Sequence, residues 1–257
     1  MKTFISPQSW FMFEYPDNWF EFEEEADVFL FYDPDRWDGN FRISATRDVS
    51  RSYASRCLQD ALGQTGAKAV TVGRYDAVLS VERFREGGAG YVDRCWLVGC
   101  GQTCVEVSFT SADDGSTEVP TVCAEVLNSL RVNVPGAFFP STLITPRLME
   151  LYEVDEAYNT MERLAKKVLK AKFTDPESTL KVLQRLADSG ALATTEDWQM
   201  LGLAFCAVMV DGCDGYEWRT LVDGMREQPM LLRADGVRLD PYTLFRPGKG
   251  TEQFQNI

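Results

Sequence analysis

The hydrophobic pattern of this 257-residue chain changes its period near the middle, at a proline-rich segment. Before that segment, short runs of alternating apolar and polar residues lie between turn-forming residues, as is typical of antiparallel strands. After it, apolar residues recur every three or four positions, which predicts helices. We therefore expect a first domain at 1–134, a linker at 135–146 and a second domain at 147–257.

The first half predicts an antiparallel sheet flanked by helices. Helical spacing from Tyr53 to Leu62 and again after Pro120 predicts one helix before and one after the last strands. Short glycine-containing connections join the later strands, which favours antiparallel neighbours. The predicted strands cover residues 10–15, 28–32, 41–46, 69–72, 75–84, 91–98 and 103–109.

The second half predicts a smaller domain of helices followed by strands. Thr145-Pro146, Asp175-Pro176 and Thr194 or Thr195 each carry the capping chemistry of a helix start. Alternation from Tyr216 to Val222 then indicates a strand, and Asp235-Gly236 indicates a hairpin. The fold class expected for the whole chain is α+β.

The chain contains no histidine, which removes the commonest general base and the commonest metal ligand. Its seven cysteines include no C-x-x-C pair, so we expect reduced thiols rather than a zinc site. The acidic turn at 33–38 lacks the closing glutamate of an EF-hand. We expect no catalytic residue, no metal and no cofactor.

The net charge of −13 is concentrated in one segment. Residues 14–38 hold ten acidic side chains against the single Arg36. Such a field repels nucleic acid and anionic lipid and speeds the approach of a basic protein surface. A solvated face that keeps the protein soluble is the alternative reading.

Aromatic residues crowd into the same segment, and most must be core because alternating strands place one set inward. Trp37 stands in a turn-prone loop between Arg36 and Asp38, where an exposed tryptophan ringed by acids would suit an interface hot spot. The partner-binding residues predicted from this pattern are Glu23, Glu24, Asp33, Asp35, Trp37 and Asp38.

The chain shows no apolar stretch long enough to span a membrane and no apolar core of a secretory signal near its beginning. We therefore expect a cytoplasmic protein that binds neither membranes nor nucleic acid.

The run from Ser9 to Trp19 (SWFMFEYPDNW), followed by strand pairs, helix, meander and helix, resembles the PsbP-like α/β fold. That fold serves a photosystem extrinsic subunit and a Ran-binding nuclear import factor. With the motifs at 198–205 and 215–218, the whole chain resembles a bacterial two-domain family of unknown function. These motifs are structural, so the resemblance implies a fold and no catalytic residue.

The leading hypothesis is a non-catalytic cytoplasmic protein-binding module, an inhibitor or immunity-type protein that masks a basic partner. The alternative is a small-molecule-binding or enzymatic role in a cleft between the domains. That role would use carboxylates, or Glu217 and Arg219.

Overall fold

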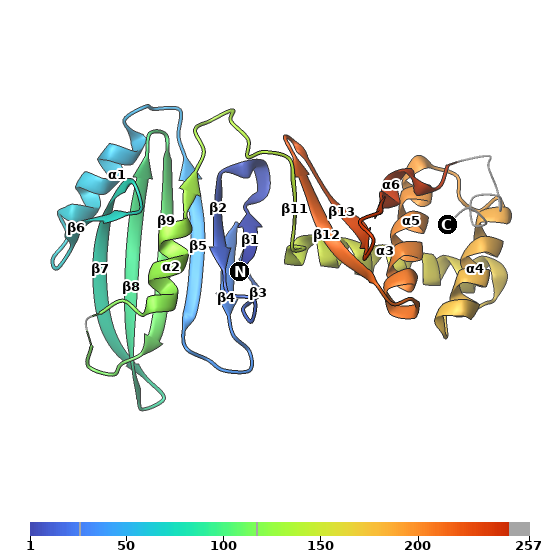
Figure 1. Ribbon diagram of the computed structural model, residues 1–257, viewed down its shortest axis with the longest axis horizontal. Helices are drawn as coiled ribbons and strands as arrows, with labels where there is room; N and C mark the ends of the chain where they lie inside the picture. The colour runs from blue at the N-terminus through green and yellow to red at the C-terminus, as the bar shows by residue number, and fades with distance from the viewer. Residues whose placement is uncertain (26, 117, 247–257) are drawn as a thin grey trace. The chain divides into compact units, whose positions relative to one another are not determined.

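The alternating apolar residues of the first half form a seven-stranded sheet in the computed structural model, which describes residues 1–25, 27–116 and 118–246 (Figure 1). Contacts divide the chain into a first unit, Met1–Ser141 with Asp223–Met225, and a second unit, Thr142–Val222 with Arg226–Ile257. All six neighbouring strand pairs of the large sheet are antiparallel. Its strand order is β3 (Phe20–Glu25), β4 (Val28–Tyr32), β5 (Asn40–Arg47), β9 (Thr103–Ala112), β8 (Ala89–Cys100), β7 (Tyr75–Glu86) and β6 (Lys68–Val72).

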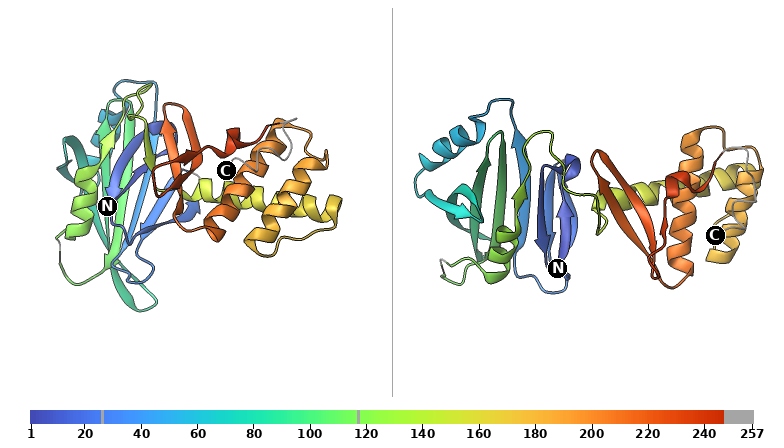
Figure 2. Two further views of the ribbon diagram at one scale, coloured as in Figure 1. Left: turned by 45° about the vertical axis from the view of Figure 1, so that its right-hand side comes forward. Right: turned by 45° about the horizontal axis from the view of Figure 1, so that its top comes forward.

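The two faces of this sheet have different coverings (Figures 1 and 2). The inner face carries buried side chains such as Trp96, Val107 and Phe109. It packs in one core with helix α2 (Thr121–Ser129) and with a second sheet. That three-stranded sheet has the order β1 (Lys2–Ile5), β2 (Phe11–Tyr15) and β10 (Arg131–Val132), with the 3-10 helix η1 (Pro7–Ser9) between β1 and β2.

Helix α1 (Tyr53–Leu62) lies against the opposite, outer face of the large sheet. Gly99 permits this approach, because a Cβ atom there would lie 2.6 Å from Cδ1 of Leu58. Most of the remaining outer face carries polar or half-buried side chains.

An aromatic layer fills the space between the two sheets of the first unit. The ring of Phe4 lies 5.3 Å from that of Phe13 and 5.2 Å from that of Phe31, measured between centroids. Trp19 stacks on Phe109 from the other end of the layer, at 6.4 Å. Edge-on and tilted ring pairs of this kind add to the stabilisation from apolar burial. These aromatic residues belong to the core, as their alternation along the strands predicts.

The second unit combines helices with a small sheet of order β11-β12-β13-β14. Its core joins α3, α4 and α5 through buried side chains that include Met161, Leu183 and Leu201. The elements are β11 (Thr142–Ile144), α3 (Leu148–Leu169), α4 (Pro176–Asp188), α5 (Thr195–Gly212), β12 (Tyr216–Asp223), β13 (Arg226–Arg233), β14 (Arg238–Leu239) and α6 (Pro241–Leu244). The predicted α+β fold class is confirmed.

Two of the three predicted helix starts in the second unit are confirmed, and one is wrong. Asp175 and Thr194 cap α4 and α5 by accepting backbone N–H bonds. Helix α3 instead starts after Arg147, two residues beyond the predicted cap Thr145. Pairing of Ile144 with Thr220 in β12 keeps the preceding chain extended, so strand β11 occupies part of the segment expected as a linker.

A buried ionic network holds the start of α3 in place. Arg147 is 1% exposed and pairs with Glu150 on the first turn of α3 and with Glu227 of β13, the latter at 2.8 Å. Glu150 also accepts the backbone N–H of Arg147 at 2.9 Å and the hydroxyl of Thr220 at 3.2 Å. The network therefore ties one helix to two strands within the second unit.

Gly202 of α5 should be required for the packing of α6. A Cβ atom at this position would lie 2.0 Å from the carbonyl oxygen of Pro241, and such overpacking typically costs about 1–3 kcal/mol. We predict that Gly202→Ala lowers the melting temperature of the second unit, measured by differential scanning calorimetry. Gly63→Ala is the matched control, since its nearest atom lies at 3.4 Å; equal melting of both variants would contradict the prediction.

Candidate functional site

The acidic loop between β4 and β5 contains one buried carboxylate. Asp33 is 6% exposed; it accepts hydrogen bonds from the side chain of Asn18 at 2.6 Å and from the backbone N–H groups of Asp35 at 2.9 Å and Arg36 at 3.2 Å. Desolvation opposes its ionisation, but these bonds hold the pKa of Asp33 below its ordinary value. Asp33 therefore organises the loop from inside, and the structure removes it from the predicted recognition face.

Trp37 projects from this loop onto strand β8. Its side chain is 42% exposed, and its indole N–H donates to Oδ1 of Asn40 at 2.7 Å. The indole meets the ring of Tyr91 edge-on at 6.0 Å, and Tyr91 stacks on Phe84 of β7 at 5.5 Å. Phe84 is itself 37% exposed. We call Trp37, Tyr91 and Phe84 the aromatic patch.

An acidic pair lies beside the aromatic patch on the outer face of the sheet. Phe84 is directly opposite Tyr91, and two residues further along the same strands Glu82 is directly opposite Asp93. Residues two apart on a strand share a face, so the pair and the patch lie on the same side. Two carboxylates in cross-strand register repel each other and destabilise the sheet. The hydroxyl of Thr110 donates a hydrogen bond to Asp93 at 2.8 Å.

The remaining predicted residues are placed as follows. Asp35 and Asp38 are exposed in the loop of Trp37, and Asp38 forms a loose ion pair with Arg36 at 3.4 Å. The side chains of Glu23 and Glu24 lie outside the described residues. The structure thus brings Asp35, Trp37 and Asp38 together and adds four residues from β7 and β8 that the sequence reasoning missed: Glu82, Phe84, Tyr91 and Asp93.

A sequence signal for these missed residues exists in the glycine pair between β7 and β8. Gly87 and Gly88 both have positive φ angles, 58° and 88°, and form a two-residue hairpin turn. Such a turn sets the register of its strands, which pairs Phe84 with Tyr91 and Glu82 with Asp93. The approach of Trp37 to Tyr91 has no comparable local signal.

The two residues predicted for the alternative function, Glu217 and Arg219, bind each other. Glu217 and Arg219 lie two apart on β12 and form an ion pair at 2.8 Å. Arg219 is half-buried and Glu217 is exposed. An exposed ion pair of this kind is worth little to stability, and nothing in its geometry distinguishes it as a reaction centre.

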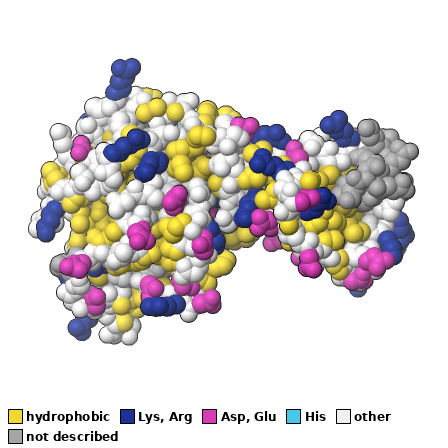
Figure 3. All heavy atoms as spheres, viewed as in Figure 1, with side chains coloured by type: hydrophobic (Ala, Val, Ile, Leu, Met, Phe, Trp, Pro, Cys, Tyr) yellow, Lys and Arg dark blue, Asp and Glu magenta, His cyan; other side chains and the backbone are white. Residues whose placement is uncertain are grey.

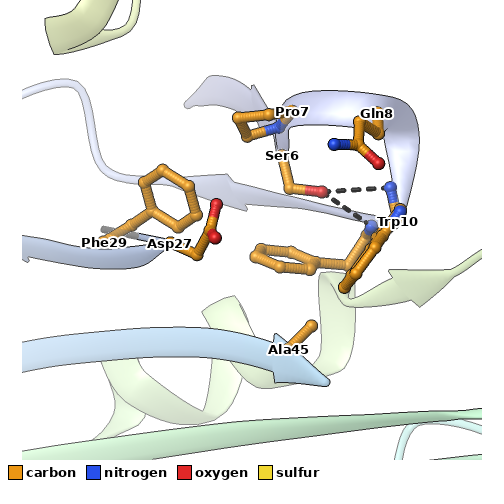
Figure 4. Close-up of a pocket in the computed structure, with 8 residues that line it drawn as sticks. Ser6, Pro7, Gln8, Trp10, Asp27, Phe29 and Ala45 are labelled. Carbon is orange, nitrogen blue, oxygen red and sulfur yellow. Dashed lines mark hydrogen bonds between the residues drawn. The ribbon is translucent and has the colours of Figure 1, made fainter. Parts of the chain in front are cut away.

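A small pocket lies beside the turn that begins at Ser6, in the first unit (Figure 4). The Ser6 hydroxyl accepts the backbone N–H groups of Trp10 at 3.1 Å and Phe11 at 3.0 Å, while Gln8 has a positive φ of 61°. The pocket volume is about 60 Å³, well below the roughly 300–1,000 Å³ of small-molecule sites. It cannot enclose a cofactor.

A larger cavity of about 440 Å³ lies in the second unit between α3, α5 and α6. Its floor is apolar, formed by residues such as Ala157, Met200 and Leu203, and its wall includes three glutamates, Glu153, Glu156 and Glu196. Tyr242 donates to Glu153 at this wall, and burial, followed by that contact, raises the pKa of Tyr242. Its volume falls within the range of small-molecule sites.

No group of three or more acidic or cysteine side chains in the described residues is arranged to hold a metal ion. Among the same residues, no helix is both long enough and apolar enough to cross a membrane. On the face of the first unit seen in Figure 3, hydrophobic side chains are interspersed with acidic and basic ones.

The chain belongs to the family described as Domain of unknown function (DUF3805), whose model matches residues 1–155. A second model, described as Domain of unknown function (DUF3806), matches residues 179–245. A crystal structure from Bacteroides thetaiotaomicron VPI-5482 is 35% identical and has a TM-score of 0.91, covering 99% of this chain and 97% of that chain. The predicted membership of a two-domain family of unknown function is confirmed.

Two further solved structures are similar over about half of the chain. One is LpqN of Mycobacterium tuberculosis, involved in cell envelope biogenesis, at 14% identity and a TM-score of 0.34, covering 48% of this chain and 83% of that chain. The other is the cyanobacterial PsbP of Synechocystis sp. PCC 6803, at 15% identity and a TM-score of 0.28, covering 51% and 92%. None of the curated proteins matches the chain. At these TM-scores neither similarity bears on function.

The seven cysteines are all free thiols, and two of those in the first unit, Cys95 and Cys123, are poor nucleophiles. Burial, aided by the carboxylates of Glu106 and Asp93, raises the pKa of Cys95 to about 11. Burial raises the pKa of Cys123 to about 12 as well. A thiol with a raised pKa holds little thiolate near neutral pH, which argues against a nucleophilic cysteine.

We predict that alkylation of the native protein at about pH 8 modifies the exposed Cys213 much faster than Cys95 or Cys123. The rate at Cys95 should rise about tenfold per pH unit up to about pH 10, because its thiolate fraction grows until the pH reaches the raised pKa. Mass spectrometry of peptides follows each site, and denatured protein, in which all seven thiols react, is the control. Equal rates at Cys95 and Cys213 at pH 8 would disprove this assignment.

Proposed function

We propose that the first unit is a non-catalytic protein-binding module that recognises a basic surface of a partner protein, as an inhibitor or immunity-type protein would. The observation that carries the proposal is the partly exposed aromatic patch, Trp37, Tyr91 and Phe84, beside the outward-facing pair Glu82 and Asp93. Aromatic anchors surrounded by polar residues are typical of interface hot spots.

The chemistry of this surface fits arginine or lysine side chains. A cation bound between Glu82 and Asp93 would relieve the repulsion between the two carboxylates, which the free protein tolerates at a cost in stability. The faces of Trp37 and Phe84 can add cation–π attraction for the same groups. Asp35 and Asp38 extend the negative field around Trp37 and would increase the association rate.

A specific observation also favours a second candidate function, small-molecule binding in the second unit. The cavity between α3, α5 and α6 combines an apolar floor with Glu153, Glu156 and Glu196, which suits an alkyl amine.

Titration with butylamine, followed by NMR, tests this role. Leu203→Trp, which would fill the floor, should abolish amine binding, whereas binding that is unchanged in this variant would place the amine elsewhere.

Reversing one charge of the acidic pair should stabilise the free protein. Glu82→Lys replaces a cross-strand repulsion with an attraction to Asp93, so we predict a gain of about 0.2–1 kcal/mol in the free energy of unfolding. Urea denaturation measures it. Glu125→Lys on α2 makes the same charge change at an exposed site on the covered side of the sheet; an equal gain there would show an effect of net charge alone.

The same surface variants should weaken partner binding. We predict that wild-type and Glu125→Lys proteins, used as baits in a native lysate, enrich a common basic protein that Trp37→Ala and Glu82→Lys fail to retain. With the purified partner, Trp37→Ala should raise the dissociation rate about tenfold or more if it costs about 2 kcal/mol. Equal enrichment by all four baits would refute a partner interface at the aromatic patch.

A further inference from the structure

Arg94 is a buried cation on the inner face of the large sheet, 2% exposed. It stands in strand β8 between Val81 and Phe109 of the neighbouring strands. Its Nη1 atom donates to the hydroxyl of Ser111 at 3.2 Å, and its Nε atom is buried without a hydrogen-bond partner. No carboxylate of the described residues forms an ion pair with it.

This arrangement leaves the Nε donor of the buried guanidinium without a hydrogen-bond partner. An arginine side chain has five N–H donors and keeps its charge at every physiological pH, yet its one hydrogen-bond partner in the described part of the chain is the neutral hydroxyl of Ser111. The carboxylate of Asp113 lies within electrostatic range of Arg94 but forms no hydrogen bond with it, and burying a charge without a hydrogen-bonded counter-charge is strongly unfavourable. An orphaned buried donor of this kind points to an acceptor that comes from outside the chain.

The guanidinium extends toward the N-terminus of α2. Ser111 lies next to Ala112, the last residue of β9, so the contact with Ser111 directs Arg94 toward that end of the strand. Cys123, in the first turn of α2, lies within electrostatic range of Arg94. The residue before the helix, Pro120, provides no side-chain cap, and the first N–H groups of a helix carry a partial positive charge.

Asp113 lies within electrostatic range of Arg94, but its carboxylate makes its hydrogen bonds to other groups. Asp113 accepts the backbone N–H of Gly115 at 3.0 Å and forms its ion pair with Arg83 at 3.3 Å. Asp114 accepts the backbone N–H of Ser116 at 2.8 Å. Arg83 also donates to the carbonyl of Ser116 at 2.9 Å. Among the described residues, therefore, no carboxylate forms a hydrogen bond with Arg94, and no side chain caps the N-terminus of α2.

We infer that Arg94 and the N-terminus of α2 form a binding site for an oxyanion group, phosphate or carboxylate. The planar guanidinium can donate two parallel hydrogen bonds to either group, and the first N–H groups of α2 can donate to its other oxygen atoms. Because neighbouring residues on a strand point to opposite faces, Arg94 faces away from Asp93 and the aromatic patch. The anion site is thus independent of the proposed partner interface.

Inorganic phosphate and acetate are the probes, each compared with sodium chloride at equal ionic strength. In the wild type, one of the two should raise the melting temperature of the first unit and shift the NMR signals of the backbone N–H groups of Thr121, Val122 and Cys123. A response to phosphate identifies a phosphate site, and a response to acetate identifies a carboxylate site. No response beyond that of chloride, with these amides unshifted, would overturn the inference without the need for any variant.

Variants of Arg94 assign the response to its side chain. Arg94→Met should weaken anion binding by at least about tenfold, since a charge-assisted pair is lost, whereas Arg85→Gln, at an exposed arginine on β7, should bind as the wild type does. Arg94→Lys keeps the charge without the planar fork and provides a second, more conservative variant. An anion response of the same size in all three variants would show that Arg94 is not the binding group.

Discussion

The packing of the inner face of the seven-stranded sheet against the three-stranded sheet and α2 is the constraint on which the first unit depends. Side chains such as Phe31, Val107 and Phe109 are fully buried there, and full burial of one such side chain is worth about 1.5–3 kcal/mol. A shift of one residue in the register of any strand would turn this apolar set to the outside. The strand pairing and the composition of the outer face follow from this burial.

Two polar exceptions to this apolar pattern are the basis of the proposed binding sites. Arg94 occupies an inward position that every neighbouring strand fills with an apolar residue, and Glu82 with Asp93 places two like charges side by side on the outward face. Neither arrangement stabilises the isolated chain. Natural sequences depart from locally favourable choices mainly at functional sites, and these two departures lie on opposite faces of the sheet, which agrees with the two separate sites proposed above.

The second unit depends on a different interaction, the buried network around Arg147. Its guanidinium and the carboxylates of Glu150 and Glu227 are held together with the hydroxyl of Thr220. Breaking a buried pair by removing one member typically costs about 3–5 kcal/mol, while the intact pair adds little net stability. We interpret the network as a device that fixes the position of α3 relative to the strands. The network also explains why α3 begins after Arg147 rather than after Thr145.

The sequence by itself determined the elements whose signals lie within a few residues: the strand alternation, the caps at Asp175 and Thr194, and the Gly87-Gly88 turn that sets the register of Glu82 and Phe84. Only the tertiary structure decided which residues meet across the sheet. It brought Trp37 onto Tyr91, buried Asp33 beneath its own loop and left Arg94 without a hydrogen-bonded carboxylate among the described residues. The physical reason is that caps and turns act through local hydrogen bonds, whereas the contacts of Trp37 and Arg94 depend on the strand order β5-β9-β8, which joins segments far apart in the chain.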